Sequence, residues 1–452
     1  MSRLLPVVLL AAASWSLPAA AWAHGVGVRG DLPLPLSVVV YGAVGVLLAS
    51  FMLLVRLWPA ARLEGDRGDP ALSMGLSRLV GGLVWPGRLL GLLAFGVVLA
   101  AGLAGPLDSQ ANLAPFAIYV ALWVGGMMVS GLVGDVWAGL NPFEAVAAGV
   151  RRLNGERGPG WLERAGQWPA VALLAAFVWL ELVHPDPADP RSLAVAVAVY
   201  AGLIVLGAVW WGPRWVRAAD AFGALFRLLA AMAPLHRGQD GRLRLRPPLV
   251  GLARLRPSRA TAALVLVALG STTFDGLTRT DLWTPISGGR TGLAAVAIGT
   301  LGLAATIAVV AGLYVWAMRE AARTSRRTTG ELVDRFAHSL VPIALGYAIA
   351  HYFSLLVFEG QRVVALASDP LGRGWDLFGT AGWSVDYTAV STTTIAAVQV
   401  AAIVGGHVAG VVLAHDRAVA LFPPEQAARS QHALLAAMVA YTVGGLLLLL
   451  GA

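Results

Sequence analysis

Ten long apolar runs dominate this sequence and restrict what it can fold into. Most have the length that an α-helix needs to cross a hydrocarbon layer of about 30 Å, while the two shortest, 89–105 and 168–184, are marginal and either extend into their flanks or form re-entrant pieces. Only 13% of the 452 residues are charged and 58% are hydrophobic, so the chain lacks the polar surface of a water-soluble protein. We therefore predict an all-α fold, a polytopic transmembrane helix bundle of about ten spans. The predicted spans are 35–55, 89–105, 113–134, 168–184, 192–212, 260–277, 292–317, 338–358, 388–413 and 432–451.

The first 23 residues have the features of a secretory signal. Arg3 precedes an apolar stretch from Leu4 to Leu17, and the small-residue pattern Ala21-Trp22-Ala23 follows. We predict that residues 1–23 are removed, so that the mature chain begins at His24 and forms a single transmembrane domain over residues 24–452. The alternative is that this segment remains as an additional membrane helix.

The arginines test this topology independently, because they played no part in choosing the spans. The sequence has no lysine, and 26 of its 33 arginines fall between the spans on one side, against 6 on the other. Basic loops stay in the cytoplasm. The pattern predicts a bacterial inner membrane protein with its mature N-terminus and its C-terminus outside.

Two connections between spans are notable. Residues 213–259 form a basic cytoplasmic loop, in which 215–232 have the spacing of a helix on the membrane surface and 236–259 suggest a solvated loop near lipid headgroups. Residues 359–387 form a periplasmic loop whose aromatic side chains suit the membrane interface.

The composition also excludes several classes of function. Cysteine is absent, which removes disulfides, thiolate nucleophiles and zinc-thiolate sites. A nucleic-acid partner is not expected, because the basic residues lie between membrane spans, where they orient helices. Membrane lipid is the expected partner, and any metal ion must be held by histidine, carboxylate or backbone oxygen.

Histidines within the spans are the first candidates for a site. His351 falls in the eighth span and His407 in the ninth, while His415 and Asp416 lie near the inner end of the ninth. An ionisable group at the centre of a membrane costs about 2.5 kcal/mol or more, so it is a functional candidate by default. The alternative is a hydrogen-bonded histidine between helices.

Two further residues belong with these candidates. If the signal is cut after Ala23, His24 offers an α-amino nitrogen and an imidazole, a chelating pair that suits copper or zinc. Asp275, at the outer end of the sixth span, is a candidate ligand, general base or supporting carboxylate. The alternatives are an ordinary first residue and an aspartate paired with Arg279.

Short motifs along the chain resemble a bacterial integral membrane family named fenitrothion hydrolase. The likeness extends from the signal junction to the ninth span. The motifs are Ala23-His24-Gly25, Arg29-Gly30-Asp31-Leu32-Pro33, Thr273-Phe274-Asp275-Gly276, His351-Tyr352-Phe353-Ser354-Leu355, Gly406-His407-Val408 and Ala414-His415-Asp416-Arg417-Ala418.

This resemblance implies hydrolysis of a small hydrophobic organophosphorus triester, a synthetic compound that stands in for an unknown natural substrate. A divalent zinc or copper ion would activate the attacking water. The resemblance implies His24, His351 and His407 as ligands and Asp275 as the carboxylate helper. His415 and Asp416 would form a structural or proton-handling pair.

Two other functions fit the same residues. In a transporter, His351 and His407 would line a path for protons, metal ions or a small solute. In a membrane electron carrier, they would be the axial ligands of a non-covalent haem. In each case we expect replacement of His351 or His407 by alanine to abolish activity, and replacement of His184 or His432 to leave it intact.

Overall fold

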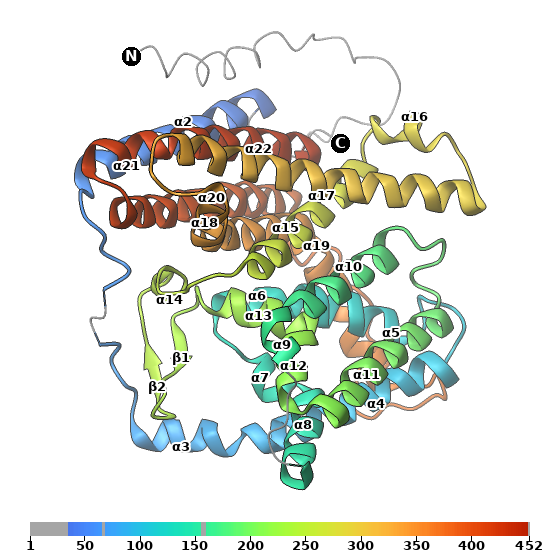
Figure 1. Cartoon of the computed structure of the whole chain (residues 1–452). Coiled ribbons are helices and arrows are strands. Elements are labelled where there is room, and N and C mark those ends of the chain that lie inside the picture. The colour runs from blue at the N-terminus through green and yellow to red at the C-terminus, as the bar shows by residue number, and fades with distance from the viewer. Residues whose placement is uncertain (1–34, 66–67, 155–159, 451–452) are drawn as a thin grey trace.

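The fold is that of a computed structural model, which describes residues 35–65, 68–154 and 160–450. Over these residues it is a bundle of helices with one small two-stranded sheet (Figure 1). The predicted all-α polytopic fold is therefore confirmed. The predicted signal at 1–23 and His24 lie outside the described residues.

Nine helical segments in the described part of the chain are long and apolar enough to cross a membrane. The chain is therefore a multi-pass membrane protein. The segments are α2 (Leu36–Leu57), α3 with α4 (Met74–Gly82, Val84–Ala104), α5 with η2 and α6 (Leu113–Pro115, Phe116–Gly125, Gly126–Leu132), α11 (Pro190–Trp211), α15 (Arg259–Thr278), α17 (Gly292–Arg323), α18 with η3 and α19 (Thr329–Phe336, Ala337–Leu340, Val341–Ser368), α20 (Thr392–Leu421), and α21 with α22 (Pro424–Ser430, His432–Leu450).

The remaining predicted span forms a shorter helix. The run 168–184 gives α10 (Trp168–Leu182), whose 15 residues reach only about 22 Å. Short elements complete the fold: α7 (Trp137–Leu140), α8 (Pro142–Asn154), α9 (Gly160–Ala165), α12 (Pro213–Ala219), α13 (Ala221–Ala230), β1 (Leu235–Arg237), β2 (Leu243–Leu245), α14 (Val250–Ala253) and α16 (Trp283–Ser287).

Polar residues set where the central helices begin. Ser258 and Thr261 form a capping box at the start of α15, in which each side chain bonds the other residue's backbone N–H. The Ser391 hydroxyl accepts from the backbone N–H of Thr394 at the start of α20. These caps satisfy N–H groups that have no partner within the helix itself.

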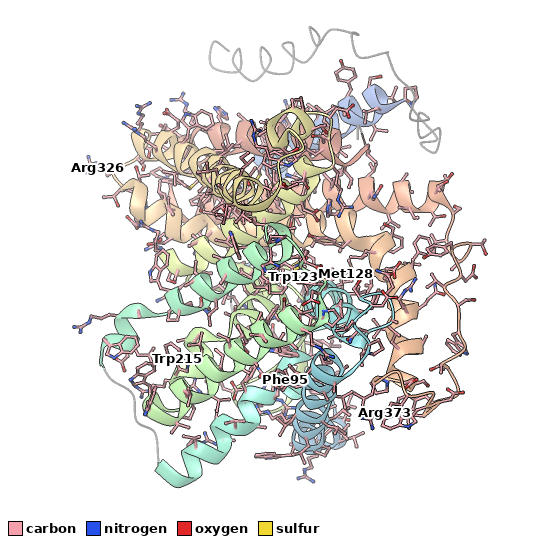
Figure 2. The ribbon with its side chains drawn as sticks, turned by 90° about the vertical axis from the view of Figure 1, so that its right-hand side faces the viewer. Phe95, Trp123, Met128, Trp215, Arg326 and Arg373 are labelled. Atoms are coloured by element: carbon pink, nitrogen blue, oxygen red, sulfur yellow. The ribbon has the colours of Figure 1, made fainter. Side chains whose placement is uncertain are left out.

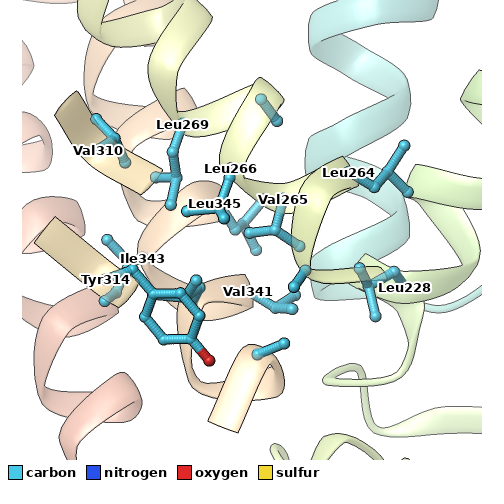
Figure 3. Close-up of a cluster of buried hydrophobic side chains, with 14 of the residues drawn as sticks. Leu228, Leu264, Val265, Leu266, Leu269, Val310, Tyr314, Val341, Ile343 and Leu345 are labelled. Atoms are coloured by element: carbon cyan, nitrogen blue, oxygen red, sulfur yellow. The ribbon is translucent and has the colours of Figure 1, made fainter. Parts of the chain in front are cut away.

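Helix α15 is the centre of the bundle. Most of its side chains are buried, whereas α2, α4 and α17 expose much of their apolar surface, as helices facing lipid do. Aliphatic side chains from α13, α15, α17 and α19 meet around it (Figure 3). The labelled members are Leu228, Leu264, Val265, Leu266, Leu269, Val310, Tyr314, Val341, Ile343 and Leu345.

The bundle has two ends, at which the helices begin or finish, and we refer to them as its two faces. On one face, which we call the basic face, the chain after α2 contacts the last turns of α20, and the start of α15 contacts α18. Arg326 belongs to this face and Arg373 to the loop after α19. Both lie at the edge of the molecule in Figure 2, while Trp123 and Met128 lie in its interior. The other end of the bundle is the opposite face.

The segment predicted as a surface helix over 215–232 is divided and largely buried. α12 keeps Arg214 and Arg217 exposed, but the chain breaks at Asp220, and Phe222 and Phe226 of α13 pack in the core beside Trp123. The expectation of one interfacial helix is therefore wrong for its second half. Nine of the ten residues of α13 are buried and Arg227 alone stays half-exposed, so this helix packs in the core rather than on a surface.

Asp220 fixes this break. Its side chain is fully buried and accepts hydrogen bonds from Asn141 Nδ2 at 2.6 Å and from the Tyr200 hydroxyl at 2.8 Å. A buried carboxylate needs such donors, because desolvation without them is costly.

The segment 236–259 is more ordered than the expected loop, since it contains a short hairpin, although most of its residues stay exposed or half-exposed. β1 and β2 pair antiparallel, and Ala71 bridges to Arg244 beside them. Asp69 binds His236 Nε2 at 2.8 Å and Arg254 Nη1 at 2.9 Å. Burial alone would raise the pKa of Asp69, but the hydrogen bonds and charges of Arg254 and His236 outweigh it and lower that pKa.

Helices α19 and α20 approach each other through glycines. A Cβ atom on Gly406 would lie 2.6 Å from the Pro342 carbonyl oxygen, and one on Gly410 would lie 2.8 Å from the Ser339 carbonyl oxygen. Gly346 faces them from α19, with the Ala402 carbonyl oxygen 2.4 Å from its Cβ position. Small residues at this spacing let membrane helices pack backbone against backbone.

We expect Gly406→Ala to lower the melting temperature of the protein in detergent. The new methyl group would overlap the α19 backbone, and overpacking of this kind costs about 1–3 kcal/mol, more than the gain of about 1 kcal/mol in helix propensity. Gly405→Ala is the matched control, since a Cβ there meets no atom of the described residues within 4 Å. Equal melting temperatures for the two variants would contradict this packing.

Candidate functional site

Asp275 and His351 meet between α15 and α19. The His351 Nε2 atom lies 2.8 Å from Asp275 Oδ2, and the Tyr352 hydroxyl donates to the same oxygen at 3.0 Å. Arg279, one turn after Asp275, binds Oδ1 with its Nη2 atom at 3.2 Å. Two neighbouring helices thus bring the carboxylate of Asp275 to a base and a phenol, His351 and Tyr352, that lie 76 and 77 residues further along the chain.

The pair is buried, and its hydrogen bonds define the tautomer of His351. The His351 side chain is 4% exposed and that of Asp275 11%, whereas the Arg279 side chain is 62% exposed toward the opposite face. Since a carboxylate accepts, His351 Nε2 carries the hydrogen, and Nδ1 is the basic nitrogen. No hydrogen-bond partner for Nδ1 exists among the residues described.

His407 lies apart from this pair. It is 1% exposed, and its Nδ1–H donates to the Ile403 carbonyl one turn earlier, at 2.8 Å. Its Nε2 atom also has no partner within the described chain. Both predicted histidines are therefore buried imidazoles with one basic nitrogen facing no protein acceptor or donor.

Two tyrosines connect these histidines. The Tyr347 ring is parallel to that of His351 with centroids 6.4 Å apart, Tyr441 is 5.7 Å from Tyr347, and His407 is 6.0 Å from Tyr441. The Tyr441 hydroxyl shares a 2.7 Å hydrogen bond with Thr273 of α15. The rings form a continuous series from the Asp275–His351 pair to the middle of α20.

The sequence suggested two kinds of cofactor for these histidines, a non-covalent haem and a zinc or copper ion. Tyr347 and Tyr441 lie between the two imidazoles in this series, and a haem ligated by both histidines stays a prediction. No group of three or more histidine or acidic side chains in the described ranges can hold a metal ion. The proposed ligand His24 lies outside those ranges, so a zinc or copper site that includes it stays a prediction.

His415 and Asp416 hold the chain that follows α2. Asp416 Oδ1 accepts from the Trp58 indole at 2.9 Å and from the Arg62 backbone at 2.6 Å. His415 contacts the Trp58 carbonyl through Nε2 at 3.0 Å. Next to them, Arg417 forms an ion pair with Glu64 at 2.9 Å and donates to the carbonyls of Ala253 and Leu255.

These contacts give His415 and Asp416 a structural role at the basic face. His415 and Asp416 are almost fully buried, and they lie near the end of α20 far from His351. Of the two roles predicted for this pair, structural or proton-handling, the geometry therefore favours the structural one.

Sequence reasoning did not select several residues of the site. Tyr352, Tyr347, Tyr441 and Thr273 were not candidates, although Tyr352 directly follows His351 and Tyr441 is a polar group in the middle of an apolar span. His338 is also fully buried, and neither ring nitrogen has a partner of normal hydrogen-bond geometry in the residues that are described.

Comparison with protein-family models, with curated proteins and with solved structures gives no match to this chain.

We expect Asp416→Ala to destabilise the protein. The substitution removes the acceptor for the Trp58 indole and the Arg62 backbone, and buried donors that lose their acceptor cost about 1–3 kcal/mol. The thermal unfolding of detergent-purified protein, followed by tryptophan fluorescence, measures the effect. Glu425→Ala is the control, because Glu425 is an exposed carboxylate on α21. An equally small change in the melting temperature of both variants would contradict the structural role of Asp416.

Proposed function

We propose that this chain is a hydrolase of the bacterial inner membrane that cleaves a small lipophilic phosphotriester, with Asp275 and His351 supplying general-base catalysis. The observation that supports this most is the Asp275–His351 pair, whose Nδ1 atom is a base held in one orientation inside the bundle. The motifs that resemble fenitrothion hydrolase include both residues.

The orientation in the membrane follows from the arginines. With α10 counted as a short tenth crossing, 26 of the 33 arginines fall in sequence segments between spans on one side, and such loops remain in the cytoplasm. The mature N-terminus and the C-terminus would then lie outside. The Asp275–His351 pair would open toward the periplasm, on the side where Arg279 is exposed.

The proposed reaction uses the two side chains in separate roles. Asp275 holds the Nε2 hydrogen of His351 and stabilises the imidazolium that forms. His351 Nδ1 removes a proton from a water molecule, whose oxygen attacks phosphorus. A new P–O bond forms, the P–O bond to the aryl group breaks, and the aryl oxide leaves with the electron pair. Tyr352 keeps Asp275 Oδ2 in place through its hydroxyl.

A lipid-facing groove supports a lipophilic substrate. It has a volume of about 520 Å³ and lies between α2 and α20, lined by valine, alanine and glycine only. Val39, Val400 and Val404 of its lining belong to the same apolar cluster as Tyr347 and Tyr441. An uncharged triester dissolved in the bilayer would therefore reach the neighbourhood of the site without crossing water.

We expect Asp275→Asn and His351→Asn to lower the hydrolysis rate by about 100-fold or more, the usual contribution of a general base. Release of nitrophenol from an aryl phosphotriester by purified protein measures it. His184→Asn is the control, because His184 lies in the loop after α10. Its Nδ1 atom accepts a hydrogen bond from the Asp186 backbone N–H, and its ring packs against Trp179. Unchanged rates in folded Asp275 and His351 variants would contradict the proposal.

We expect removal of metal ions by EDTA to leave the hydrolysis rate unchanged, because in the proposed reaction the imidazole of His351 activates the water molecule. The rate before and after dialysis, with elemental analysis of the same samples, makes the comparison. If the rate fell and zinc or copper restored it, a metal-bound water rather than His351 would supply the hydroxide. His24 would then be the first proposed ligand to mutate.

A further inference from the structure

We propose that the chain also conducts protons across the membrane, along a line of buried imidazole and phenol groups that includes His351, His407 and His338. All three histidines are buried, with residue exposures of 8%, 1% and 0%. His351 and His407 each have one ring nitrogen that finds no partner in the described part of the chain, and the His338 ring lies against the backbone of Arg335 and Leu413. Unpaired buried polar groups cost about 1–3 kcal/mol each, and in membrane spans such groups line ion and proton paths.

The first half of the path begins at the opposite face. Arg279 is exposed there and binds Asp275, which binds His351 Nε2 at 2.8 Å. From His351 the ring contacts continue through Tyr347 and Tyr441 to His407. The Tyr441 hydroxyl, in its hydrogen bond with Thr273, is a donor and acceptor at the centre of this half.

The second half uses the close contact between α19 and α20. Gly410 lies against the Ser339 carbonyl, the residue directly after His338, and the backbone of Leu413 lies beside the His338 ring. Gly410 is three residues after His407, which is about 4.5 Å along the helix axis. His407 and His338 thus belong to facing segments less than two turns apart.

A charged cavity completes the path at the basic face. It has a volume of about 480 Å³ and is lined by Arg335, one turn before His338, and by Arg417 of α20. Its carboxylates, Glu64, Glu331 and Asp334, can receive a proton and exchange it with water. The line of groups therefore begins and ends at groups that solvent reaches.

Transfer along the line needs only proton hops. His407 accepts a proton at Nε2, since Nδ1–H is donated to Ile403, and releases the same proton when the ring turns toward His338. His338 accepts on one nitrogen and releases from the other. No bond other than N–H and O–H bonds forms or breaks, and no electron moves.

The packing favours protons over a metal ion or a solute as the species that crosses. At Gly346, Gly406 and Gly410 the backbones of α19 and α20 are so close that even a Cβ atom would overlap them. A proton passes such a constriction by hopping between side chains, whereas a larger species needs a pore.

The test uses the full-length protein in liposomes of phosphatidylethanolamine and phosphatidylglycerol that contain a pH-sensitive dye. A potassium gradient with valinomycin makes the interior negative and draws protons inward. We expect wild-type protein to acidify the interior faster than protein-free liposomes. His407→Gln and His338→Gln should reduce the rate to that of protein-free liposomes, while His432→Gln, half-buried beside Phe51, should retain it.

Two results would overturn the inference: a wild-type rate equal to that of protein-free liposomes, or full conduction by His407→Gln. Where a glutamine variant does not give monodisperse protein, Tyr441→Phe replaces it and should slow acidification. Phosphotriester hydrolysis is measured on the same proteoliposomes. Loss of one activity with retention of the other then separates a failure of this inference from a failure of the proposed hydrolase.

Discussion

The close contact between α19 and α20 is the interaction on which the rest of the site depends. Gly346, Gly406 and Gly410 allow the two backbones to touch, and His407 on α20 is thereby linked to His351 on α19 through the rings of Tyr441 and Tyr347. Lipid gives helices no hydrophobic reason to associate, so packing and polar contacts must hold them together. The same glycines that stabilise the bundle therefore also position its buried imidazoles, and a bulkier residue there would separate the groups as well as the helices.

Two aspartates hold the bundle at its two ends in different ways. Asp275 binds only side chains, those of His351, Tyr352 and Arg279. Asp416 binds mainly backbone N–H groups of the chain after α2, together with the Trp58 indole. A carboxylate whose partners are side chains can change partners when a proton moves. One that closes a backbone loop cannot do so without unfolding that loop, and this difference separates a candidate site from a structural contact.

The sequence predicted the helices well and the contacts between them poorly. Nine apolar runs became membrane-length helices in the described residues, because a run of that length has no other stable form in lipid. The residue types at Asp275, His351 and His407 drew attention because charge is costly in a membrane. Their partners did not follow, since Asp275 and His351 are 76 residues apart and which helices are neighbours is a tertiary property. α13 was misassigned for a related reason: the flanking arginines suggested a surface, while its own apolar side chains all found partners in the core.

The burial of α13 has a consequence for how the protein is made. A helix of ten residues covers only about 15 Å, too little to enter a bilayer as an independent unit. Its aromatic side chains pack on Trp123 and Phe177, which precede it in the chain, while Leu228 lies in the cluster that α15 and α19 build after it. It therefore gains its full set of contacts only when α15 and α19, which follow it in the chain, are also in place.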